Sequence, residues 1–144
     1  MTRRVAVLMG GLSAEREVSL VSGAAVIKAL TSLGYSVIAI DVGHDIVTKL
    51  APMRSSVDVI FNALHGQHGE DGCVQGLCEL MDIPYSHSGV LASALAMNKP
   101  LAKRLFQEAG IPVAASRVVT RDEVLAGHPM RRPYVLKPID EGSS

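Results

Sequence analysis

The chain has 144 residues, of which 48% are apolar and 19% charged, and its 14 basic residues balance its 14 acidic ones. A neutral, apolar-rich chain of this length buries a substantial core, which excludes disorder as its main state. Zero net charge and an aromatic content of 3% give no sign of the basic face and stacking rings that nucleic-acid binding uses.

The chain also lacks the usual targeting signals. No apolar run approaches the ~20 residues that span a bilayer, and the run at residues 5–9 is too short for a signal peptide. We therefore expect a cytoplasmic protein with neither a nucleic-acid nor a membrane partner. Cys73 and Cys78 fit neither a zinc motif nor a disulfide, so both are expected to be buried thiols.

The first part of the chain alternates strand and helix signals. Residues 5–9 form an apolar run closed by two glycines, which is typical of a parallel strand covered on both faces. A helix is expected over residues 14–33, capped by Ser13 and, from its many apolar residues, largely buried. Further elements follow the same alternation: strands at 37–42 and 57–64, a short helix at 46–50, an amphipathic helix after Asp71, and a short strand opened by Pro84 and Tyr85. This order implies a parallel sheet with right-handed crossovers.

The alternation ends near Gly89, so a domain boundary is expected between residues 90 and 100. Two helices are predicted next, one over residues 90–97 and one capped by Asn98. The remaining predictions are a strand at 113–119, a short helix opened by the capping-box pattern Thr120 to Glu123, and a last strand at 134–137. Residues 141–144 resemble the start of a loop rather than the end of a protein.

Three loops follow predicted strands, at the sheet edge where ligands bind in open α/β folds. The first, residues 10–15, combines two glycines with a helix start, but it is neither a dinucleotide fingerprint nor a P-loop. Its acid, Glu15, has two interpretations: it balances the helix dipole, or it faces a cleft and binds an ammonium group.

The second loop, residues 65–72, holds three glycines, two histidines and two acids. Such a loop on a rigid scaffold is typical of a functional site, and His65 is the better candidate because it lies nearest the strand end. A metal pair of His65 and His68 has no obvious third ligand. The isolated histidines are expected to be surface or structural residues: His44, His87 and His128.

The third loop is residues 137–144. Lys137 closes an apolar strand, which is costly unless it meets an anion, and the glycine and serines after it offer donors that cradle phosphate. Lys99 stands at a helix start, where a cation opposes the dipole. A phosphate ligand would explain both lysines.

Four motifs, in the same order, resemble those of the D-alanine–D-alanine ligases, and the resemblance covers nearly the whole chain. They lie at residues 10–19, 65–81, 89–99 and 135–144. The resemblance implies an α/β chain in which a Rossmann-like, parallel-sheet substrate domain, residues 1–95, precedes the start of an ATP-grasp domain, residues 96–144. On this interpretation the sequence stops within the glycine-rich loop of the ATP-grasp domain.

The resemblance also implies residue roles. Glu15 and Ser143 are implied as catalytic residues: Glu15 anchors the ammonium of the first D-alanine, and Ser143 binds nearby and helps to lock the active-site lid. His65 and Glu70 would lie close to the same D-alanine. The implied ATP-binding residues are Lys99, Lys137, Glu141, Gly142 and Ser144. The family usually has Asp at the position of Asn98.

The implied reaction has two steps. The carboxylate of one D-alanine attacks the γ-phosphate of ATP, and the amine of a second D-alanine attacks the resulting acyl phosphate, giving D-alanyl-D-alanine for peptidoglycan synthesis. Fixed lysines and loop N–H groups would stabilise the negative charge. Mg²⁺ (or Mn²⁺) is expected with ATP, and the resemblance places its ligands beyond Ser144, so these 144 residues alone are expected to be inactive.

Two other functions stay open. The chain is consistent with another ATP-grasp ligase, such as one that joins D-alanine to D-lactate or D-serine. It is also consistent with a non-catalytic folding or dimerisation module, because the family's homodimer contact is implied to lie in the amino-terminal part.

Overall fold

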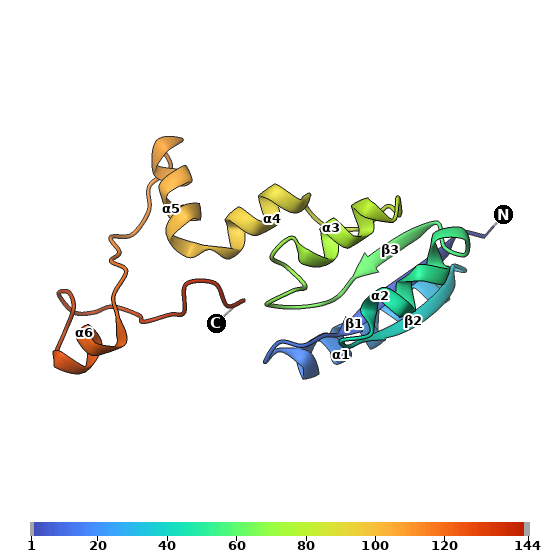
Figure 1. The fold of residues 1–144 in the computed structure, drawn as a ribbon, viewed down its shortest axis with the longest axis horizontal. Coiled ribbons are helices and arrows are strands. Elements are labelled where there is room, and N and C mark those ends of the chain that lie inside the picture. The colour runs from blue at the N-terminus through green and yellow to red at the C-terminus, as the bar shows by residue number, and fades with distance from the viewer. Residues whose placement is uncertain (1, 143–144) are drawn as a thin grey trace.

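A computed structural model describes residues 2–142, whose centre is a parallel sheet. Its strands are β1 (Arg4–Gly10), β2 (Ser36–Val42) and β3 (Val59–Asn62), arranged in the order β2-β1-β3 (Figure 1). β1 is central, pairing from Arg4 with Ser36 on one side and from Val5 with Val59 on the other. The predicted fold class and parallel sheet are confirmed.

Helices cover both faces of this sheet, as the unbroken apolar run of β1 predicts. Val5 and Val7 pack on the side of α1 (Arg16–Ser32), whereas Ala6 and Leu8 face the opposite layer. That layer contains α2 (Ile46–Leu50), the 3₁₀ helix η1 (Ala51–Ser55) and α3 (Cys73–Leu80). Alternate side chains of β1 therefore anchor two separate core clusters.

The short strand predicted to open at Pro84 and Tyr85 is reduced to a single bridge. Tyr85 pairs in parallel with Ile60, and the Ile60 N–H donates to the Pro84 carbonyl oxygen at 2.8 Å. The Ser86 N–H donates to the Ile60 carbonyl oxygen at 2.9 Å. These bonds extend the sheet beyond β3 and fix the segment that leads to Ser86.

The expectation that α1 is largely buried is wrong. Its buried residues are Ser19 and Gly23, and Val21 is 73% exposed. The Ser19 hydroxyl donates to the Ala63 carbonyl oxygen at 2.7 Å, and Gly23 lies against the Met9 side chain. A narrow line of small residues thus brings α1 close to the sheet, while many of its apolar residues face away.

Three further helices follow: α4 (Val90–Met97), α5 (Lys99–Glu108) and α6 (Arg121–Ala126). The Asn98 side chain caps α5 by accepting from the Leu101 N–H at 3.1 Å. Thr120 and Glu123 form both hydrogen bonds of the predicted capping box. Within residues 2–142, no helix has the length and apolar character needed to cross a membrane.

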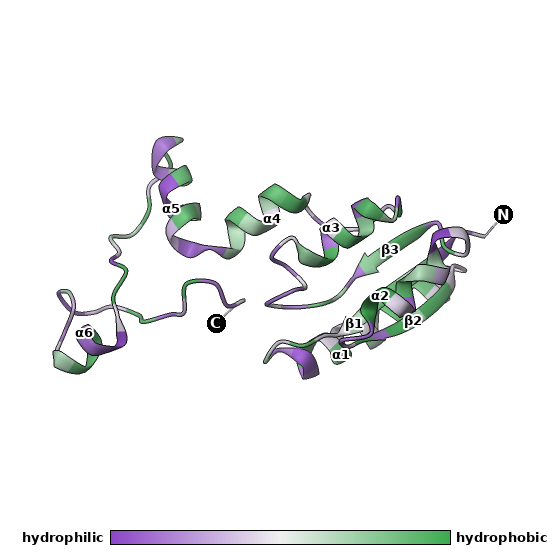
Figure 2. Cartoon of the chain, viewed as in Figure 1, coloured by the Kyte–Doolittle hydropathy of each residue, from purple (hydrophilic) through white to green (hydrophobic). Residues whose placement is uncertain are grey.

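The strands predicted at 113–119 and 134–137 do not form in the described chain. A strand needs a neighbouring strand for its backbone hydrogen bonds, and neither segment pairs with one among residues 2–142. Several of their apolar side chains are open to solvent, with Val118 58% and Val135 78% exposed, and Figure 2 shows green apolar stretches in this extended part.

Candidate ligand-binding cleft

The ends of β1 and β3 bring the first two predicted loops together. The Ser13 hydroxyl donates to the His65 carbonyl oxygen at 2.7 Å, and its oxygen accepts from the Glu15 N–H at 3.1 Å. The predicted N-cap role of Ser13 is therefore shifted: α1 begins at Arg16, Glu15 occupies the N-cap position, and Ser13 closes the turn before it.

Glu15 lies where the three predicted loops meet. A Cβ added to Gly66 would lie 2.6 Å from Glu15 Oε2, and one added to Gly142 would overlap the same carboxylate and lie 2.8 Å from Gly66 Cα. Two glycines thus allow segments far apart in sequence to approach the acid. The Glu15 side chain makes no capping hydrogen bond, although Glu15 occupies the N-cap position of α1.

Glu70 stabilises the second loop. Its Oε2 accepts a hydrogen bond from the Gly66 N–H at 2.6 Å, which closes the loop upon itself. Glu70 also lines a cleft of about 580 Å³ that separates this loop from α4 and the C-terminal segment. Both Glu70 and Glu15 therefore approach Gly66.

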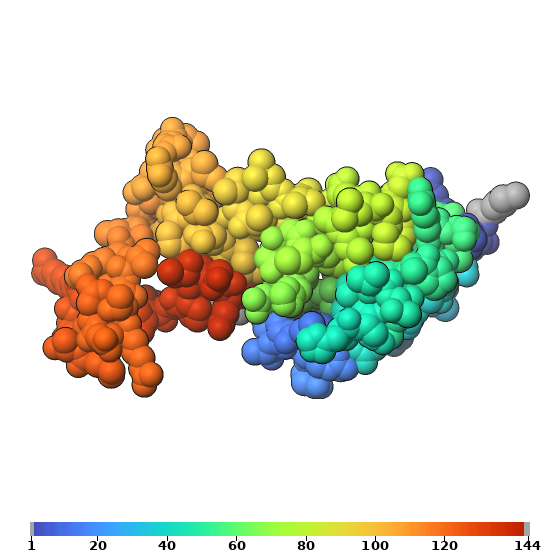
Figure 3. Space-filling view, viewed as in Figure 1, coloured from blue at the N-terminus to red at the C-terminus, as the bar shows by residue number. Residues whose placement is uncertain are grey.

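The cleft gathers four of the predicted site residues. The Lys99 side-chain ammonium donates to the Glu141 carbonyl oxygen at 2.6 Å, and the Lys99 N–H donates to the Ile139 carbonyl oxygen at 3.0 Å. These bonds hold the end of the described chain beside α4, where Figure 3 shows it in red next to the yellow helix. The residues that line the cleft are Glu70, His87, Ser88, Ala92, Ser93, Ala96, Met97, Lys99, Glu141 and Gly142.

The other predicted site residues lie elsewhere. The His65 ring is half-buried, with Nε2 3.2 Å from the Ser22 hydroxyl, and it does not line the cleft. Lys137 is exposed on the C-terminal segment and is also absent from the lining. Ser143 and Ser144 lie outside the described residues.

His87, expected to be an isolated surface or structural residue, lines this cleft and is oriented by two buried amides. Asn62 Oδ1 accepts from the Leu64 N–H at 3.1 Å, so Asn62 Nδ2 is the atom that donates to the Gly69 carbonyl oxygen at 2.8 Å. Gln75 Nε2 donates to the same carbonyl at 2.9 Å. These two amide nitrogens lie 3.4 and 3.2 Å from His87 Nδ1.

His87 Nδ1 therefore accepts, and the neutral ring carries its proton on Nε2. The sequence offered no signal for this role, because Asn62, Gln75 and His87 come from three different elements of the chain. One residue of this network is incompletely paired: within the described part of the chain, the buried Gln75 Oε1 has no hydrogen-bond partner.

The cleft is chemically mixed. Glu70 supplies a carboxylate, Lys99 an ammonium group, and Ser88 and Ser93 hydroxyl groups, while Ala92 and Ala96 make one wall apolar. Such a site suits a small ligand that carries both charged and apolar groups. Fold and cleft together define a parallel α/β protein with a candidate ligand site near the carboxyl ends of its strands.

Comparison with known proteins specifies the family. The profile described as "D-ala D-ala ligase N-terminus" matches residues 4–48 and 43–88. D-alanine–D-alanine ligases are 58% identical in Parvibaculum lavamentivorans, over 99% of this chain and 46% of that protein, and 59% identical in Cereibacter sphaeroides, over 98% and 45%. The chain belongs to the D-alanine–D-alanine ligase family, and it spans about half the length of the curated relatives it matches.

Solved structures of ligases also resemble this chain in fold. The D-alanine–D-alanine ligase of Bacillus anthracis aligns with a TM-score of 0.70 at 32% identity, over 85% of this chain and 42% of that chain. The VanG D-Ala:D-Ser ligase of Enterococcus faecalis aligns with a TM-score of 0.74 at 30% identity, over 99% of this chain and 54% of that chain. The predicted resemblance is confirmed.

Proposed function

We propose that this chain is the amino-terminal part of an ATP-dependent ligase that joins two D-alanines through an acyl phosphate. The observation that carries this proposal is the convergence of Glu15, Gly66 and Gly142 beside a cleft lined by Glu70 and Lys99. An acid and a cation at one sheet edge can bind the opposite charges of an amino acid and of a phosphate. Family membership supplies the reaction class.

The residue roles follow this geometry. Glu15 would anchor the ammonium group of the first D-alanine, with Glu70 shaping the same side through Gly66. His65 is assigned near this substrate through its backbone contact with Ser13 rather than through the cleft lining. Ser143 would complete the contact with Glu15, since it follows Gly142 directly.

The nucleotide would lie on the side of the cleft that Lys99 lines. Its ammonium group is held at the Glu141 carbonyl oxygen, where it can also meet phosphate oxygens, and Gly142 and Ser144 would add loop donors. Lys137 would approach the phosphates from the exposed C-terminal segment. A Bacillus anthracis relative was solved in complex with ATP, at 36% identity and a TM-score of 0.68 over 76% of this chain and 38% of that chain. Mg²⁺ (or Mn²⁺) would neutralise phosphate charge, and no residue of this chain is assigned to it.

The wider biological assignment has four parts. We place the boundary between the substrate domain and the ATP-grasp domain between residues 95 and 96, in the last turn of α4 and before α5. A homodimer through the amino-terminal part would cover the outer face of α1, where Val18 is 57% and Val21 73% exposed.

The cytoplasm is the proposed location, because the reaction consumes ATP and because both cysteines are free thiols. There the product would enter peptidoglycan synthesis.

The test uses a protein in which this chain continues over the remaining length of its relatives. We expect phosphate release that needs both ATP and D-alanine, with D-alanyl-D-alanine detected by mass spectrometry. Glu15→Gln should raise KM for D-alanine about 10- to 100-fold, because a charged hydrogen bond is lost. Glu17→Gln, in the first turn of the same helix, is the matched control.

Equal effects of the two substitutions, or no D-alanine-dependent phosphate release, would contradict the proposal. The 144-residue chain alone, mixed with ATP and D-alanine, should release no phosphate above background.

A D-alanine–D-serine ligase is the second candidate, favoured by the alignment of VanG with 99% of this chain. Competition between D-alanine and D-serine as acceptors, followed by product analysis, separates the two. D-alanyl-D-serine as the main product would replace the first proposal by the second.

A further inference from the structure

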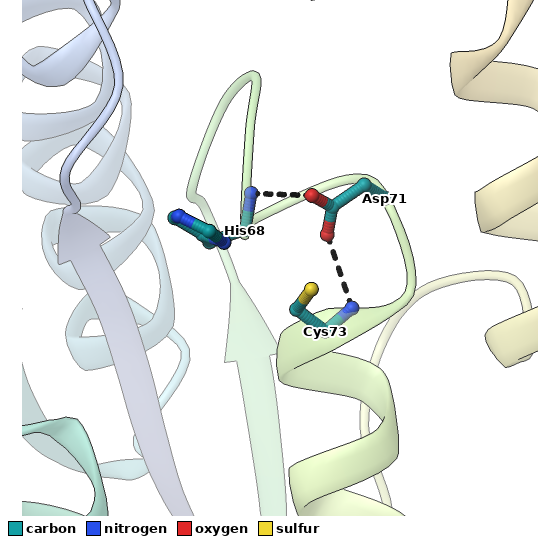
Figure 4. Close-up of side chains that lie close together, drawn as sticks. All are labelled: His68, Asp71 and Cys73. Atoms are coloured by element: carbon teal, nitrogen blue, oxygen red, sulfur yellow. Dashed lines mark hydrogen bonds between the residues drawn. The ribbon is translucent and has the colours of Figure 1, made fainter. Parts of the chain in front are cut away.

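Three side chains of different chemistry converge at the start of α3, apart from the residues that line the cleft. A ring nitrogen of His68, a carboxylate oxygen of Asp71 and the sulfur of Cys73 all lie within 4.8 Å of one another (Figure 4). His68 and Cys73 are exposed and Asp71 is half-buried, so an ion reaches these atoms directly from solvent. Cys73 is thus not the buried thiol that its sequence predicted.

The turn before α3 fixes the central ligand. The Asp71 carboxylate accepts hydrogen bonds from the His68 N–H at 2.8 Å and from the Cys73 N–H at 3.0 Å. Each carboxylate oxygen keeps a lone pair after these bonds. The Cys73 sulfur lies within 4.8 Å of an Asp71 carboxylate oxygen, and the His68 imidazole makes no hydrogen bond with residues 2–142. The sulfur and the carboxylate are therefore already together, and the imidazole is available beside them.

We propose that His68, Asp71 and Cys73 form a binding site for a thiophilic divalent cation, and that this cation is Zn²⁺. Imidazole nitrogen, carboxylate oxygen and thiolate sulfur are the ligand atoms that Zn²⁺ takes, and three of them leave a fourth position for water. The Cys73 S–H bond breaks as the Zn–S bond forms, and its proton passes to solvent. Mg²⁺ prefers oxygen ligands, so this site is distinct from any metal that accompanies ATP.

The distances are compatible with one ion. Zn–S bonds are about 2.3 Å and Zn–N bonds about 2.0 Å long, so ligand atoms within 4.8 Å of one another reach a common ion after small side-chain rotations. His68 and Cys73 are free to make these rotations because both are exposed. Neighbouring Glu70 holds the same loop closed at Gly66, so a bound ion would tie that loop to α3.

Cysteine spacing did not predict this site because only one cysteine takes part. Cys78 lies on the buried face of α3, 1% exposed in the core cluster. The other two ligands, His68 and Asp71, lie in the loop before α3. The turn at the start of α3 brings their side chains close to Cys73.

The test is a Co²⁺ titration of the 144-residue chain, followed by displacement with Zn²⁺. Bound Co²⁺ with a thiolate ligand gives a sulfur-to-metal charge-transfer absorption band, and this band should appear with one equivalent and vanish when Zn²⁺ is added. Cys73→Ser should abolish the band and weaken Co²⁺ binding by at least about 10- to 100-fold, and His68→Gln should weaken binding similarly. Cys78→Ser is the matched control and should keep the band.

A band that is missing in the parent chain, or that survives Cys73→Ser and disappears with Cys78→Ser, would overturn the proposal. Far-ultraviolet circular dichroism confirms that each variant is folded, and the thermal midpoint of the parent chain, but not of Cys73→Ser, should rise with Zn²⁺. The experiment needs neither ATP nor D-alanine, so its outcome does not depend on the proposed ligase function.

Discussion

The Lys99 ammonium group donates a 2.6 Å hydrogen bond to the backbone carbonyl oxygen of Glu141, which fastens the start of α5 to the end of the described chain. A second bond, from the Lys99 N–H to the Ile139 carbonyl oxygen at 3.0 Å, reinforces this contact. One lysine thus positions the glycine-bearing segment at the cleft through both its backbone and its side chain.

Gly142→Ala should loosen this contact, because the new methyl group would overlap the Glu15 carboxylate and crowd Gly66. We expect faster amide hydrogen exchange at Lys99, whose N–H is protected by Ile139. Gly89→Ala is the control, since a Cβ there meets nothing within 4 Å. Unchanged exchange at Lys99 in the Gly142 variant would show that the segment is not held in this way.

Two helical glycines should respond in opposite directions to alanine. In Gly23→Ala the added methyl group meets the Met9 side chain beneath α1, so we expect a loss of about 1–3 kcal/mol in the free energy of unfolding. In Gly76→Ala the nearest atom is Val90 Cγ2 at 3.9 Å, so the better helix propensity of alanine should stabilise α3 by about 0.5–1 kcal/mol. Urea denaturation of both variants measures the change in the free energy of unfolding. A change of the same sign in both variants would contradict the packing described for α1.

The ion pair between Arg16 and Asp41 should make stability depend on pH. Two hydrogen bonds of 2.8 Å from the Arg16 guanidinium hold the pKa of the Asp41 carboxyl below its ordinary value of 3.8. Because the folded-state pKa is depressed, the pair stabilises the fold above the unfolded-state pKa, and this contribution is lost as the pH falls through the folded-state pKa.

Asp41→Asn should therefore lower the free energy of unfolding at neutral pH, and the difference from the parent chain should shrink once the pH falls below 3.8. The effect is small, because both side chains are about half exposed. Asp140→Asn serves as a control, as Asp140 forms no ion pair that the structure records among residues 2–142. A difference that stays constant through the acid range would argue against the pair.

His87 should carry its ring proton on Nε2. The Asn62 and Gln75 amides present N–H donors to Nδ1, and the orientation of Asn62 is fixed independently by the Leu64 N–H. Nitrogen-15 chemical shifts of the histidine rings report the tautomer directly, and exposed His44 provides an internal reference. A ring protonated mainly on Nδ1 at neutral pH would mean that the two amides are turned the other way.

Local patterns determined several elements from the sequence. The apolar run at residues 5–9 predicted β1, and the Thr120 to Glu123 spacing predicted the capping box of α6, because both signals act over a few residues. Composition could not show which side of α1 faces the sheet. The strands predicted at 113–119 and 134–137 failed for a related reason: strand propensity forms no strand without a neighbour to pair with.

For the candidate site, the sequence by itself determined the residue types, the three loops and, through ordered motifs, the family. Only the tertiary structure decided which of these residues meet. It placed Glu70 and Lys99 at one cleft, left His65 and Lys137 outside its lining, and added His87 through two buried amides. The physical reason is that a site is made by contacts between distant segments, whose close approach depends on packing and on glycines such as Gly66 and Gly142 rather than on local sequence.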